Sequence, residues 1–119
     1  MPGLRDLDLS ETQQDTIRGI GEQNRETGQA MAEQVGAARM ALNETVLSES
    51  FNEGNVRTLA AQLAALEADA AVQRAYVSSQ IWQVLTSGQK AELRELQTDA
   101  MEQRMEQRGE GRARRGRRR

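Results

Sequence analysis

Few residues in this sequence have the type and spacing that metal binding or catalysis requires. Met101 and Met105 lie one helical turn apart, the only methionine spacing that suggests a site for a soft ion such as copper(I). Methionines at helical spacing are far more often hydrophobic filler, so we expect no metal site. The adjacent serines Ser78 and Ser79 have no base beside them that would activate a hydroxyl.

The amino-acid composition excludes further chemistry. The chain of 119 residues has no histidine and no cysteine. It therefore lacks the commonest general base, the commonest metal ligand, thiolate nucleophiles and Cys-based zinc sites. It also has no Gly-rich phosphate-binding loop. We expect a protein that is not an enzyme and that needs no cofactor.

A five-residue motif occurs twice, as Leu-Ser-Glu-Thr-Gln at residues 9–13 and as Leu-Thr-Ser-Gly-Gln at residues 85–89. The hydroxyl side chain of such a motif accepts a hydrogen bond from the backbone N–H three residues on, while the glutamine reaches back to the cap. Each copy therefore predicts a capping box that starts a helix. The shared positions are Leu9, Ser10 and Gln13 in the first copy and Leu85, Thr86 and Gln89 in the second.

The elements that position these motifs follow from periodicity. After Ser10, apolar or small residues recur every three or four positions and predict helix to about Glu49. Glycines within this stretch weaken a helix, so we expect a break between Asn24 and Gly28, which divides it into a short first helix and a longer second one. The recurring positions are Ile17, Ile20, Asn24, Gly28, Met31, Val35, Ala38, Leu42 and Val46.

Residues 50–55 predict the turn of a helical hairpin. Asn52 is a good N-cap for the next helix. Phe51 precedes this cap and can pack on Val56, the fourth residue after the cap, as a hydrophobic staple. We therefore expect Phe51 to anchor the hairpin corner.

A third helix is expected from Glu53 to about Leu85, and a fourth from Ser87 to about Gln107, separated by the second motif. Residues 10–108 would then form one helical domain. We expect residues 1–9 to be a lead-in whose leucines, Leu4, Leu7 and Leu9, pack on the bundle. We expect residues 109–119 to be disordered, because arginines repel one another and nothing apolar is available to bury.

The two larger aromatic residues, Tyr76 and Trp82, lie about 120° apart around the third helix, so one can face the core and the other a surface. Exposed aromatics beside an aliphatic stripe suit a hydrophobic surface of low specificity. Alternatively, Trp82 simply packs the junction between the third and fourth helices. Together with Met101 and Met105, these residues are our candidates for contact with other proteins.

The net charge of −2 conceals a strong asymmetry. Residues 108–119 carry a charge of +6, whereas the remaining chain carries −8. Such a tail could bind nucleic acid through phosphates, but an acidic body with few aromatics favours a solubilising or loosely electrostatic role. We expect no specific nucleic-acid partner. No apolar run approaches the roughly 18 residues that a membrane span requires.

With the two motifs placed at the starts of the first and fourth helices, the chain resembles the Spy/CpxP family of periplasmic proteins, which is named for paired Leu-Thr-x-x-Gln motifs. The likeness covers most of residues 9–108 and includes the Phe51-Asn52 corner and the Gln/Arg-rich ending. Ser10 replaces the threonine of the first motif and keeps its hydroxyl. The net acidic body departs from the basic cradle of the family's best-known chaperone.

The resemblance implies an all-α, four-helix extended hairpin that forms a cradle-shaped antiparallel homodimer. It implies a periplasmic, ATP-independent holdase chaperone for unfolded or misfolded clients, with the signal peptide removed. The alternative that it implies is an accessory protein of an envelope-stress or heavy-metal signalling system, which contacts a sensor-kinase ectodomain. The related CnrX-like and ZraP-like proteins coordinate metal largely through histidine, which this chain lacks.

Overall fold

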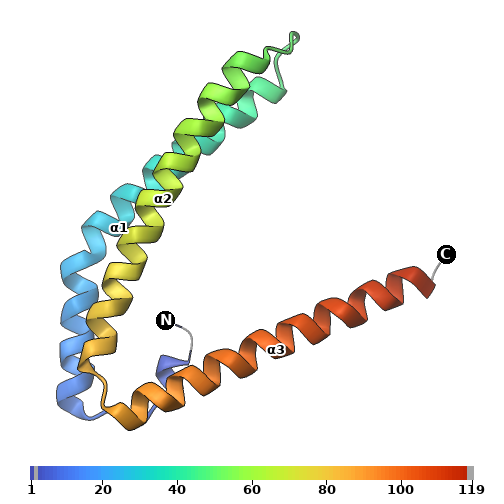
Figure 1. The fold of residues 1–119 in the computed structure, drawn as a ribbon. Helices are drawn as coiled ribbons and strands as arrows, with labels where there is room; N and C mark the ends of the chain where they lie inside the picture. Colours follow the sequence, from blue (N-terminus) through green and yellow to red (C-terminus); the bar gives the residue numbers. More distant parts are fainter. Residues whose placement is uncertain (2, 118–119) are drawn as a thin grey trace.

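The computed structural model describes residue 1 and residues 3–117, and this part of the chain is all-α, with no strand. A short 3-10 turn, η1 (Leu4–Asp6), precedes three long helices, α1 (Glu11–Val46), α2 (Glu53–Val84) and α3 (Ser87–Arg117). Figure 1 shows α1 and α2 as an antiparallel hairpin and α3 leaving its open end as a separate arm, so that the two form a V. The Cα atoms extend over 58 × 45 × 16 Å, so the molecule is open and flat.

The number of helices differs from the prediction of four. The predicted break between Asn24 and Gly28 is wrong, because α1 is continuous from Glu11 to Val46. Asn24 explains this result. Its side-chain amide donates to the Ile20 carbonyl and to Gln80 Oε1, and its Oδ1 accepts from Gln73. These bonds tie the glycine-rich part of α1 to α2, and this tertiary contact outweighs the weak helix propensity of glycine.

The tip of the hairpin confirms one prediction and contradicts another. The Asn52 side chain accepts from the backbone N–H of Asn55 at 3.0 Å and caps α2 as expected. The predicted anchor is wrong, because Phe51 is 84% exposed while Val56 is half-buried on the side of α2 that faces α1. The Phe51 ring lies mostly in solvent, since two helices meeting at their ends offer no third surface to pack against.

The predicted helix from Glu53 to about Leu85 is confirmed as α2. By contrast, α3 is longer than predicted and continues to Arg117, so the expectation of disorder from Gly109 is wrong for residues 109–117. Arginine and alanine are good helix formers, and cations near a helix C-terminus interact favourably with the helix dipole. The last two residues of the predicted disordered tail, 118–119, lie outside the described residues.

Besides Ile20, Ala70 and Ile81, which are buried along α1 and α2, the described chain has a buried core at the open end of the hairpin, where α1, α2 and α3 meet. Leu7, Leu85 and Leu93 form its centre, and Leu93 has no exposed surface. The expectation that the lead-in leucines pack on the bundle is confirmed. The half-buried neighbours of this core are Leu4, Leu9, Trp82 and Leu96. The cradle-shaped dimer concerns two copies of the chain and stays a prediction.

Candidate functional site

Both predicted capping boxes are present. Ser10 Oγ accepts from the Gln13 backbone N–H at 3.1 Å, and Gln13 Oε1 accepts from the Ser10 N–H at 3.0 Å. The second copy repeats these bonds, with Thr86 Oγ1 accepting from Gln89 N–H at 3.2 Å and Gln89 Oε1 accepting from Thr86 N–H at 2.9 Å. The first box therefore starts α1 and the second starts α3.

The glutamines of the two boxes also bond to each other, which the sequence analysis did not anticipate. Gln13 Nε2 donates to Gln89 Oε1 at 2.7 Å, and Gln89 Nε2 donates to Gln13 Oε1 at 3.1 Å. Each amide nitrogen has a second acceptor. Gln13 donates to the Val84 carbonyl at 3.1 Å, and Gln89 donates to the Asp8 carbonyl at 2.8 Å.

This arrangement has internal twofold pseudosymmetry. Val84 precedes the second motif as Asp8 precedes the first, so each glutamine bonds to its own cap, to its counterpart and to the residue before the other motif. The glutamine pair joins the segment between η1 and α1, the start of α1, the end of α2 and the start of α3. We call these two motifs and their mutual bonds the glutamine lock.

The hairpin explains why the motifs meet. Because α2 returns along α1, its C-terminal end lies beside the N-terminal end of α1 (Figure 1). The motif that ends α2 is thereby brought to the motif that starts α1. The signal was available in the sequence, since the two capping boxes flank two helical segments of similar length joined by one turn.

Aromatic and cationic residues reinforce the same corner. Lys90 Nζ lies 5.7 Å and Arg94 Cζ 5.2 Å from the ring centroid of Trp82, within the range of cation–π attraction. Trp82 is half-buried and packs on the leucine core. The structure thus favours the second of the two interpretations of Trp82, a residue that packs the junction between α2 and α3.

The other candidate contact residues are exposed. Tyr76 is 54% exposed on α2, and Met101 and Met105 are more than half exposed on α3. They do not gather with Trp82 into one site. Sequence reasoning missed Val72, which lies one helical turn before Tyr76 and is 70% exposed.

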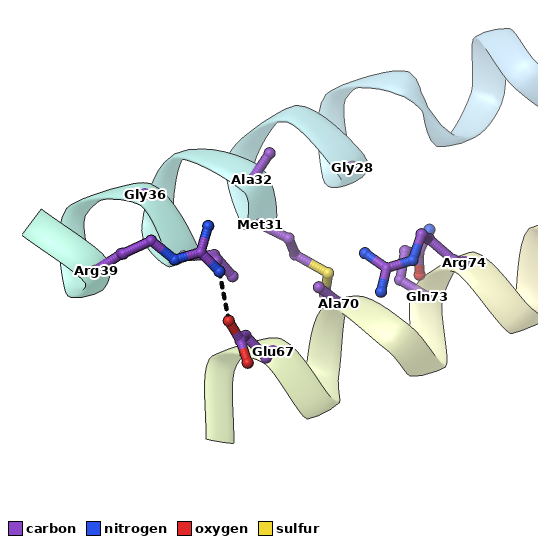
Figure 2. Close-up of a pocket in the computed structure, with 10 residues that line it drawn as sticks. Gly28, Met31, Ala32, Gly36, Arg39, Glu67, Ala70, Gln73 and Arg74 are labelled. Carbon is purple, nitrogen blue, oxygen red and sulfur yellow. Dashed lines mark hydrogen bonds and ion pairs between the residues drawn. The ribbon is translucent and has the colours of Figure 1, made fainter. Parts of the chain in front are cut away.

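A shallow groove runs between α1 and α2 halfway along the hairpin (Figure 2). Small residues of α1, Gly28, Ala32 and Gly36, leave it open. Arg39 Nη2 and Glu67 Oε1 close one end with an ion pair of 2.6 Å. Both side chains are about half exposed, which limits the contribution of this pair to stability.

Within residue 1 and residues 3–117, no group of three or more His, Cys, Asp or Glu side chains has the geometry to hold a metal ion. None of the helices in this part of the chain is apolar over a stretch long enough to cross a membrane.

The fold and the lock define a class of protein: a helical hairpin with paired capping motifs that fix a third helix. In agreement with this, residues 4–97 match the family model of the LTXXQ motif family protein. The chain belongs to this family, which is the Spy/CpxP type. No curated protein and no solved structure matches the chain.

Proposed function

We propose that this protein is a periplasmic, ATP-independent holdase chaperone that works as a homodimer and holds unfolded or misfolded proteins on exposed apolar side chains. Membership of the LTXXQ family supports the location and the general role. The observation that carries the proposal is the apolar outer face of α2, on the side away from α1.

This face is uncharged over about five helical turns. We define the outer α2 face by its exposed members, Ala61, Ala65, Ala68, Val72, Ala75, Tyr76 and Ser79. A helix that is apolar on both sides usually has neighbours on both sides. Among the described residues, only the α1 side of α2 is extensively covered, so the outer α2 face is available to a second protein.

The outer α2 face suits weak, general binding. Alanine and valine offer apolar area without pockets that would select a particular side chain, and Tyr76 adds an aromatic ring with a polar edge. Charged residues border this face, with Asp69 at its side and Arg57 one helical turn before Ala61. Such neighbours favour rapid release, because they keep water close to the bound segment.

An aggregation assay tests the proposal. A client protein is diluted from denaturant, and light scattering is followed with and without a few-fold molar excess of this protein. We expect strong suppression by the wild type and several-fold weaker suppression by the double variant Val72→Ser, Tyr76→Ser. Met40→Ser is the matched control, because Met40 is 66% exposed on α1, away from the outer α2 face. Absence of suppression by the wild type would refute the chaperone function.

The hairpin tip favours a second candidate function, an accessory protein that binds one sensor-kinase ectodomain. Val46, Leu47 and Phe51 are each at least 77% exposed and lie together at the end of the hairpin. Three carboxylates are close to them in the sequence, at Glu44, Glu49 and Glu53. A compact apolar patch with a charged rim is typical of a specific protein–protein contact.

The two functions predict different effects of substitutions at the hairpin tip. The triple variant Val46→Ser, Leu47→Ser, Phe51→Ser would abolish capture of a kinase ectodomain in a pull-down and leave aggregation suppression intact if the accessory function holds. Loss of aggregation suppression with this variant would instead place the tip in client binding. Calorimetric titration with copper, zinc and nickel tests the metal-sensing form, for which absence of heat with all three metals is the contrary result.

A further inference from the structure

The groove between α1 and α2 has the size of a small-molecule site (Figure 2). Its volume is about 610 Å³, within the range of roughly 300–1,000 Å³ that is usual for ligand pockets. Apolar side chains line it, with Met31 and Val35 half-buried on α1 and Ala70 buried on α2. Its α1 side runs from Gly28 to Arg39, which is about 16 Å at a rise of about 1.5 Å per residue. The groove therefore offers a long, narrow apolar surface.

The lining of this groove is positively charged, in contrast to the hairpin around it. Two arginines and one glutamate line it, Arg39, Arg74 and Glu67, which gives a charge of +1. Residues 11–84, which include α1 and α2, carry five arginines and ten carboxylates, a charge of −5. The groove is thus a place on an acidic hairpin where an anionic group is locally favoured.

The two arginines of the groove differ in whether their charge is already paired. Arg39 is held by Glu67 at 2.6 Å. Arg74 forms no hydrogen bond or ion pair with any residue of the described chain. Figure 2 shows its guanidinium beside Ala70, at the end of the groove away from the Arg39–Glu67 pair. Because a guanidinium binds a carboxylate through two parallel N–H···O bonds, Arg74 offers an open anion-binding position beside an apolar surface.

We infer that this groove binds a long-chain fatty acid, with its carboxylate on Arg74 and its acyl chain along Ala70, Met31 and Val35. With C–C bonds of about 1.5 Å, an extended chain of roughly 12 carbons fits the length of the groove. A linear chain suits the site because the groove is narrow and unbranched. None of the lining residues belongs to the outer α2 face, so this binding does not depend on the proposed chaperone function.

Isothermal titration calorimetry with sodium dodecanoate, below its critical micelle concentration, tests the site on the full chain. We expect saturable binding of dodecanoate. Dodecyltrimethylammonium has the same alkyl chain and the opposite charge, and it should bind at least about ten-fold more weakly because Arg74 repels it. Equal affinities for the two amphiphiles, or no saturable binding of dodecanoate, would overturn the inference.

Substitution of the arginine tests the position of the carboxylate. Arg74→Gln should weaken dodecanoate binding at least about ten-fold, because the bidentate, charge-assisted bonds are lost. Arg108→Gln is the matched control, since Arg108 is exposed on α3, outside the groove, and the variant removes the same charge. It should leave the affinity unchanged. Equal effects of the two variants would show that Arg74 does not hold the carboxylate and would refute the site.

Filling the groove tests the position of the acyl chain. Ala32→Leu places a larger side chain in the lining and should weaken dodecanoate binding at least about five-fold. Ala37→Leu is the matched control, because Ala37 is exposed on α1 about 180° around the helix from Gly28. It should bind dodecanoate as the wild type does. Equal affinities for Ala32→Leu and Ala37→Leu would contradict binding in the groove.

Two other results would assign the surfaces differently. Loss of dodecanoate binding with Val72→Ser, Tyr76→Ser, but not with Ala32→Leu, would place the acyl chain on the outer α2 face and refute the groove. If the wild type bound no dodecanoate and Ala32→Leu disrupted self-association in sedimentation, the groove would be a contact between copies and the inference would fail.

Discussion

The side-chain amides of Gln13 and Gln89 form a reciprocal pair, with donor–acceptor distances of 2.7 and 3.1 Å, although the two residues are 76 positions apart. Each amide also bonds to the cap of its own helix. The pair is half-buried beside the leucine core. One polar contact therefore sets the start of two helices and joins them, and this is why the direction of α3 depends on residues of α1.

Replacement of one glutamine should destabilise the protein because it removes the reciprocal pair of hydrogen bonds between the two amides, together with the bonds of the lost side chain to its own cap and to the other segment. We expect Gln13→Ala and Gln89→Ala each to lower the free energy of unfolding by about 1–2 kcal/mol. The double variant should cost less than the sum of the two, by at least about 0.5 kcal/mol, because both changes remove the same pair. Urea unfolding followed by circular dichroism measures all three values. Strict additivity would show that the two amides act independently.

The capping hydroxyl of the second motif gives a separate prediction. Thr86→Ala should cost roughly 1 kcal/mol, because the Gln89 backbone N–H loses its acceptor. Thr86→Ser keeps the hydroxyl, as Ser10 does in the first motif, and should cost much less. Thermal unfolding of the two variants provides the comparison. Equal stability of Thr86→Ala and the wild type would contradict the capping role.

Local features of this structure were predictable from the sequence, because capping and helix periodicity depend on residues close in the chain. The caps at Ser10, Asn52 and Thr86 are examples, and so is the length of α2. Tertiary contacts were not predictable in the same way. The bonds of Asn24 to α2 keep α1 continuous through its glycines, and they depend on how the hairpin closes.

In the candidate site too, local features were predictable from the sequence and tertiary contacts were not. Each capping box could be predicted alone, whereas the bond between Gln13 and Gln89 required the relative positions of the helix ends. Phe51 was misjudged for the opposite reason: a local staple pattern was present, but no surface lies near enough to cover the ring. A pattern predicts burial only where the fold supplies a second surface.

The continuity of α1 makes its glycines a test of the fold. A Cβ atom added at Gly21 or Gly28 would have nothing within 4 Å. We therefore expect Gly21→Ala and Gly28→Ala each to raise the free energy of unfolding by about 0.5–1 kcal/mol, because alanine loses less backbone entropy in a helix. A loss of stability with Gly28→Ala would indicate that α1 is interrupted there.

Gly3 provides the contrasting control. Its φ of 84° lies in the left-handed region, and a Cβ atom would lie 3.3 Å from Leu93 Cδ1 and from Leu96 Cβ. Gly3→Ala should therefore destabilise the protein and loosen the N-terminal segment from α3. Urea unfolding of the three glycine variants under one set of conditions should show a higher free energy of unfolding for Gly21→Ala and Gly28→Ala and a lower one for Gly3→Ala.

The contact of Trp82 with Lys90 and Arg94 predicts an optical signal at the junction of α2 and α3. Trp82 is the only tryptophan, so its fluorescence reports on this corner alone. Lys90→Met and Arg94→Met keep an unbranched apolar side chain and remove the cation, and each should cost about 0.5–1 kcal/mol. Acrylamide quenching of Trp82 should increase in both variants, most in the double variant, because the cations cover the ring.

Arg104→Met is the matched control, since Arg104 lies farther along α3 and contacts no aromatic ring in the described chain. Unchanged quenching in the double variant would show that the two cations do not shield the indole ring in solution.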